Sequence, residues 1–171
     1  MNLFEQTTKV LEWPRLLDAL AGHARSTMGA ARCRVLELAG DLEDAIRRQQ
    51  ETTEMVRLQA AGDGLPPLMF PDIRDPLARA QKGAALELLE LRDCAIVLEL
   101  LEESGRFILR HQQDATALGV VGQSLQSAGE LRPVKSALDA AIHQDGSMKE
   151  SATPELRRLT HQAHALKQQI R

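Results

Sequence analysis

Apolar residues recur every three or four positions along most of the chain, which is the spacing of amphipathic helices. The longest run covers residues 87–112, with apolar positions at Leu88, Leu89, Leu91, Cys94, Ala95, Val97, Leu98, Leu101, Phe107 and Ile108. A second run covers 155–171 and places Leu156, Leu159, Ala163, Leu166 and Ile170 at steps of 3, 4, 3 and 4, the pattern of a heptad seam. The pattern predicts a mainly all-α protein of about seven helices that ends in a long helix.

Residues that favour the first turn of a helix precede several of these runs. They are Pro14, Ser26, Asp41, Pro133 and Thr153. We expect Ser26 to cap a helix over 27–38, Asp41 to cap one that ends near Ala60, and Thr7 or Thr8 to cap a short turn at 7–11. The last run contains no stop signal, so we expect its helix to continue beyond Arg171.

Two segments interrupt the helical pattern. Residues 60–76 contain two Gly and four Pro, yet also Leu65, Leu68, Met69, Phe70 and Ile73, which predicts a loop held against the helices. Residues 142–153 contain Asp145–Gly146, a dipeptide typical of tight hairpin turns. We therefore expect a small β-hairpin near residues 142–150.

Charge limits what the chain can bind by itself. The net charge is −3, so no overall positive field attracts nucleic acid, and any contact needs a local patch. The one candidate patch lies in the last run, where Arg157, Arg158, Lys167 and Arg171 could lie near DNA. The alternative is an ordinary solvated helix face.

Several kinds of site are not indicated. Cys33 and Cys94 form no CxxC pair and are expected to be buried free thiols of a reducing cytoplasm. No signal-peptide pattern or apolar run of ~20 residues is present, so the expected location is the cytoplasm and no membrane partner is expected. No phosphate-binding G-x-x-x-x-G-K-[ST] run occurs either. We assign no catalytic or cofactor-binding residue.

A metal site is the remaining chemical alternative. His161 and His164 are three residues apart on the last helix, a spacing that suits chelation. The sequence offers no third ligand near them, so we assign no metal site and expect a solvated polar face.

Three stretches together resemble the N-terminal region of the second bacterial MutS paralogue. They are LEWPRLLDALAGHARSTMGAAR at 11–32, FPDIRDPLARAQKGAALELLEL at 70–91 and IHQDGSMKESATPELRRL at 142–159. The resemblance implies a helical lever and core domain over 1–153, followed at 154–171 by the start of the long helix that leads to a DNA clamp.

The same resemblance implies a function for the longer protein. This chain would be a non-catalytic part of a MutS-like, DNA-binding ATPase that uses ATP and Mg²⁺, forms a homodimer and acts on branched or non-standard DNA. Suppression of homologous recombination, a downstream nuclease and action on ribosomes are associated with that family.

Two alternatives remain open. The chain could be a stand-alone helical adaptor that binds protein partners through residues 65–73. A small metal-dependent enzyme using His161 and His164 is the other alternative.

Overall fold

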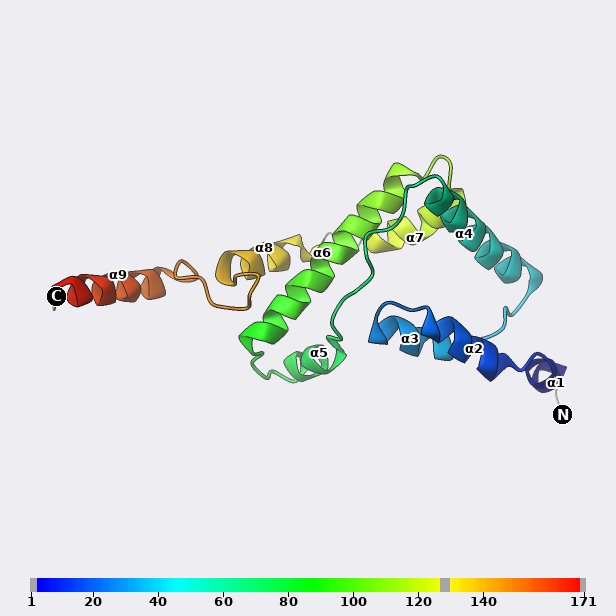
Figure 1. The fold of residues 1–171 in the computed structure, drawn as a ribbon, viewed down its shortest axis with the longest axis horizontal. Helices are drawn as coiled ribbons and strands as arrows, with labels where there is room; N and C mark the ends of the chain where they lie inside the picture. The colour runs from blue at the N-terminus through cyan, green and yellow to red at the C-terminus, as the bar shows by residue number, and fades with distance from the viewer. Residues whose placement is uncertain (1–2, 127–129, 170–171) are drawn as a thin grey trace. The chain divides into compact units, whose positions relative to one another are not determined.

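The computed structural model describes residues 3–126 and 130–169, and the described residues are mainly helical (Figure 1). Their helices are α1 (Leu3–Val10), α2 (Trp13–Gly22), α3 (Thr27–Arg34), α4 (Leu42–Ala60), α5 (Arg74–Gln81), α6 (Leu88–Arg110), α7 (Thr116–Gln126), α8 (Arg132–Ala141) and α9 (Pro154–Gln169). The predicted fold class is confirmed, with more helices than expected. Within these residues, no helix is both long and apolar enough to cross a membrane.

The chain divides into two compact units. The first consists of Met1–Asp72 and Glu103–Gln126, and the second of Ile73–Glu102 and Ser127–Arg171, so that α6 contributes residues to both. The predicted division at residue 153 follows a different criterion, the start of a clamp helix, and it stays a prediction.

Two of the predicted helix caps are formed in the structure. The backbone N–H of Gly29 donates to Ser26 Oγ (3.1 Å), and that of Asp44 donates to Asp41 Oδ1 (2.8 Å). Prolines occupy the first turns of α2 and α8. The sequence could predict these caps because each cap joins residues within one helical turn.

Two predicted helix boundaries were wrong. Helix α1 already begins at Leu3, so Thr7 and Thr8 lie inside it and do not cap it. Helix α3 ends at Arg34, four residues earlier than expected. A tertiary contact competes with its continuation, because the indole N–H of Trp13 donates to the carbonyl of Leu36 (3.0 Å).

The core of the first unit lies where α6 meets α7. Phe107 and Ile108 of α6 are 4% exposed and cluster with Ala115 and Leu118, against half-buried side chains of Met55, Leu58, Leu65 and Leu125. A Cβ placed on Gly122 would lie 2.8 Å from Cγ2 of Ile108. The glycine therefore permits a close approach of the two helices that a larger residue would prevent.

A carboxylate from α4 holds the first turn of α7. Glu54 Oε1 accepts the backbone N–H of Ala117 (3.2 Å), and Oε2 accepts that of Leu118 (2.9 Å). These N–H groups belong to the first turn of a helix, where they have no partner within the helix. A negative charge there is also favoured by the helix dipole.

The second unit buries Ile73, Cys94 and Ile142. Cys94 is a buried free thiol, as expected, and burial raises its pKa, with Asp93 and Glu90 adding to the effect. Cys33, in the first unit, is free but only half-buried. Arg79 of α5 forms an ion pair with Glu90 of α6.

The predicted β-hairpin is reduced to a turn. Ile142 and Met148 form one isolated antiparallel bridge around Asp145–Gly146, and the described residues contain no strand. The flanking residues are taken up by α8, which continues to Ala141. The Asp-Gly signal thus located the turn correctly and the strands wrongly.

Replacing Glu54 by Gln should lower the free energy of unfolding by about 1–2 kcal/mol, because the charged acceptor of two N–H groups at the start of α7 is lost. Urea unfolding followed by circular dichroism measures this. Glu51→Gln is the matched control on the same helix, since it removes only the 2.6 Å ion pair with half-exposed Arg47, worth about 0.3–0.5 kcal/mol. Equal effects of the two substitutions would show that Glu54 has no special role.

Candidate nucleic-acid interface

Helix α9 carries the basic residues that the sequence singles out. Thr153 Oγ1 accepts the backbone N–H of Leu156 (3.0 Å), which caps the helix as predicted. Arg157 and Arg158 are exposed, and neither has an ion-pair partner in the part of the chain that the structure describes. Being consecutive, they point to different faces of the helix.

The structure describes the other two predicted basic residues only in part. Lys167 belongs to α9, but its side chain lies outside the described residues, as does the whole of Arg171. No patch of all four residues can therefore be drawn. The apolar seam is better described: Leu159 is 53% and Leu166 59% exposed, so part of it faces solvent.

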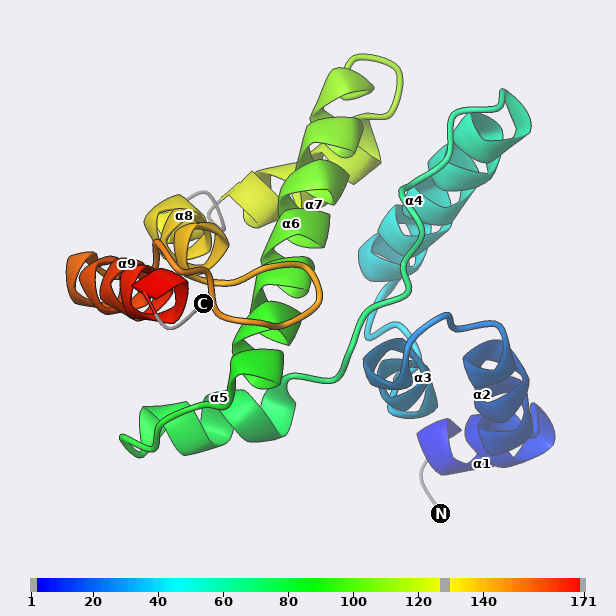
Figure 2. The same ribbon diagram turned by 60° about the vertical axis from the view of Figure 1, so that its left-hand side comes forward.

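The turn before α9 is fixed to α6. Gly146 has φ +84° and is buried, and a Cβ placed on it would lie 2.4 Å from Cδ2 of Leu89. The backbone N–H of His143 donates to the Ser147 carbonyl (2.8 Å), and that of Lys149 donates to the Ala141 carbonyl (2.8 Å). Figure 2 shows this loop folded back from α8 onto α6.

Charged side chains reinforce the same region. A hollow of about 550 Å³ lies between α6, α8 and the turn. On its α8 side, Lys135 Nζ donates to Asp139 Oδ2 (2.7 Å), a bond that raises the pKa of Lys135. Lys149 donates to the backbone carbonyl of Asp139. The Lys149 bond ties the end of α8 to the segment that leads into α9.

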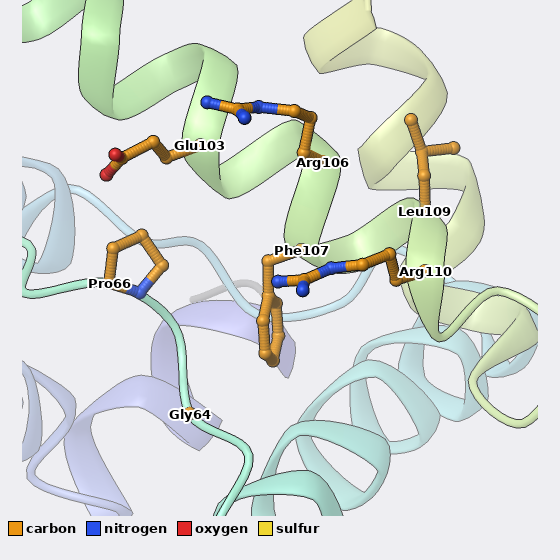
Figure 3. A pocket seen from close by; sticks show the side chains of 7 residues that line it. All are labelled: Gly64, Pro66, Glu103, Arg106, Phe107, Leu109 and Arg110. Carbon is orange, nitrogen blue, oxygen red and sulfur yellow. The ribbon is translucent and has the colours of Figure 1, made fainter.

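The first unit holds two further hollows beside an extended segment, residues 64–67, which we call the strap. One hollow, of about 660 Å³, is lined by Gly64, Pro66, Glu103, Arg106, Phe107, Leu109 and Arg110 (Figure 3). The other, of about 460 Å³, lies between the strap and residues that include Arg25, Met55 and Gln59. The sequence analysis missed these arginines because residues 25 and 106 are far apart along the chain.

No family model matches the chain, but relatives do. A protein named endonuclease MutS2 from Gemmatimonas aurantiaca is 31% identical over 152 residues, which are 88% of this chain and 18% of that protein. The endonuclease MutS2 of Exiguobacterium sibiricum is 28% identical over 165 residues, 95% of this chain and 21% of that protein. That of Lachnoclostridium phytofermentans is 38% identical over 98 residues, 55% of this chain and 12% of that protein.

The chain is a MutS2-related region. The resemblance stated from the sequence is thereby confirmed, and the first two matches cover most of the chain. The chain spans about a fifth of the length of these curated relatives, or less.

The structure of this MutS2-related chain gives no support to a metal site at His161 and His164. His161 is exposed, and the side chain of His164 lies outside the described residues. Among the residues that are described, no three His, Cys, Asp or Glu side chains come together as a metal site. His111, which the sequence did not single out, lies with Nδ1 3.0 Å from the Phe107 carbonyl oxygen and Nε2 3.4 Å from Asp63 Oδ2, and a ring N–H donates to these acceptors according to the tautomer.

Gly146→Ala should lower the free energy of unfolding by more than Gly83→Ala does. Both glycines have positive φ (+84° and +83°), a conformation that costs alanine roughly 1–2 kcal/mol. Only Gly146 also meets Leu89, whose side chain must leave its rotamer at a further cost of about 0.5–1.5 kcal/mol. Urea unfolding of both variants measures the difference, and equal losses would mean that the turn is not held against α6.

The carboxyl group of Asp145 should titrate below the 3.8 of an unperturbed aspartate. The Ser147 hydroxyl donates to it (2.6 Å) and the Ser147 N–H does so too (2.9 Å), and these bonds lower its pKa. Because the folded pKa is depressed, the stabilisation is present above the unfolded pKa and is lost as pH falls through the folded one. Carboxyl NMR shifts against pH measure the midpoint. Ser147→Ala should raise it toward the ordinary value, and an unchanged midpoint would contradict the assignment.

Proposed function

We propose that this chain is a non-catalytic part of a MutS-like, DNA-binding ATPase and that it couples the ATPase to a DNA clamp. The support that carries most weight is the base of α9. A helix that begins at a capped residue, a few residues after a turn in which Gly146 packs against Leu89, would move with the body that holds that turn. Such a connection transmits a displacement, whereas a loose linker absorbs it.

The proposal extends to the rest of the protein. The longer protein would hydrolyse ATP with Mg²⁺, act as a homodimer in the cytoplasm and bind branched or non-standard DNA. Suppression of homologous recombination, endonuclease activity and action on ribosomes are further proposals, of which the names of the relatives support the nuclease. On α9, residues Arg157, Arg158, Lys167 and Arg171 would lie near DNA.

A protein-binding adaptor is the second candidate. In the segment 65–73, Met69 is 69% and Leu68 39% exposed, while Leu65 and Phe70 are half-buried and Ile73 is buried. The segment is therefore held at several points and offers two apolar side chains to a partner. Nucleotide-independent binding of a protein, abolished when Leu68 and Met69 are replaced by serine, would favour this function.

Inserting a Gly-Ser linker between Ala152 and Thr153 should uncouple α9 from the turn while keeping its Thr153 cap. In the full protein we expect the ATPase rate and the nucleotide-free DNA affinity to persist. The change of DNA affinity caused by ATP, typically about 5- to 150-fold in an allosteric protein, should disappear. Fluorescence anisotropy with branched DNA, with and without a non-hydrolysable ATP analogue, measures it.

The same linker between Gly40 and Asp41 is the control. Gly40 is exposed, and a Cβ placed there would have nothing within 4 Å. This insertion should leave the response to ATP intact. A response that survives the insertion at Thr153 would show that α9 does not carry the coupling.

A further inference from the structure

The arginines beside the strap differ from several others in the chain. In the described residues, ion pairs with carboxylates are formed by arginines that include Arg15, Arg34, Arg47, Arg48, Arg79, Arg92 and Arg132. Arg25, Arg106 and Arg110 are exposed and, among these residues, have no such partner. Arg32, Arg57, Arg157 and Arg158 are also exposed and lack such a partner among these residues, but only Arg25, Arg106 and Arg110 line the strap hollows.

The two hollows form one charged surface. They share Gly64 and Pro66, so both border the same strap. Together they hold three guanidinium groups and one carboxylate, that of Glu103, an excess of positive charge in a chain whose net charge is −3. Charge of this sign favours an anionic ligand.

The shape of the surface favours an extended ligand. Both hollows are open, and Gly64 has no side chain to block an approach along the strap. Arg106 and Arg110 lie one helical turn apart, about 6 Å along α6, with the ring of Phe107 between them in sequence (Figure 3). Two cations at this separation suit successive charges of a chain better than one small anion. A planar guanidinium group also matches a phosphate with two parallel hydrogen bonds.

We propose that the strap hollows bind the phosphodiester backbone of nucleic acid, with Arg25, Arg106 and Arg110 at the phosphates. The proposal rests on the proposed function in taking nucleic acid as the ligand. It places the contact in the first unit, on other residues than the basic ones of α9. No residue of the set is placed to read bases, so binding is independent of sequence.

The test compares two variants of the 171-residue chain with equal charge changes. One replaces Arg25, Arg106 and Arg110 by Gln. The other replaces by Gln the residues Arg32, Arg57 and Lys82, which are also exposed and lack ion-pair partners among the described residues. Anisotropy of a short fluorescein-labelled DNA duplex gives the affinity over a range of salt concentrations, and circular dichroism checks that each variant is folded.

We expect the strap variant to bind roughly tenfold more weakly or worse at low salt, since even one lost hydrogen bond to a charged group is worth about that factor. Its slope of log affinity against log salt should fall by about 2.7, or 0.9 for each lost phosphate contact. The control variant should keep most of the affinity and most of its dependence on salt. Polyglutamate at equal charge should compete poorly.

Four results would overturn the proposal. Equal losses in the two variants would mean a general charge effect, and loss only in the control would move the contact away from the strap to the replaced control residues. Competition by polyglutamate as strong as by DNA would mean that the ligand is an acidic peptide. Absence of DNA binding by the unaltered chain would exclude this site, while the coupling function, tested by the linker insertion, would be untouched.

Discussion

The two hydrogen bonds from α7 to Glu54 organise the first unit. They join α4 to the start of a helix more than sixty residues later, and in doing so they set α7 against α6, where Phe107, Ile108 and Leu118 form the core. Without an acceptor, the first N–H groups of α7 would be partly buried and unsatisfied, a cost comparable to the net gain of several contacts. The packing and the electrostatics of this unit thus depend on one carboxylate.

In the second unit, backbone conformation holds neighbouring elements together. Gly146 allows the turn to lie against Leu89, and the bonds around it hold the end of α8 to the segment that precedes α9. The proposed coupling draws on this arrangement, because a helix can report movement only if its base is held. The charged hollow next to the turn adds side-chain bonds to the backbone ones.

Charge is distributed locally in a way that the net value conceals. Several arginines are used in ion pairs on helix surfaces, where such pairs contribute little to stability. The unpaired ones beside the strap come from two elements, the loop before α3 and the end of α6. Their proximity therefore matters for ligand binding rather than for the stability of the fold.

The sequence by itself determined the helical class, the caps at Ser26, Asp41 and Thr153, the turn at Asp145–Gly146 and the relation to MutS2. Each of these depends on residues close together in the chain or on the pattern of whole stretches. The tertiary structure alone decided the early end of α3 at the Trp13 contact, the loss of the hairpin strands, the role of Glu54 and the gathering of arginines at the strap. Those features join residues that are distant in sequence, and a local pattern carries no information about which distant side chain will arrive.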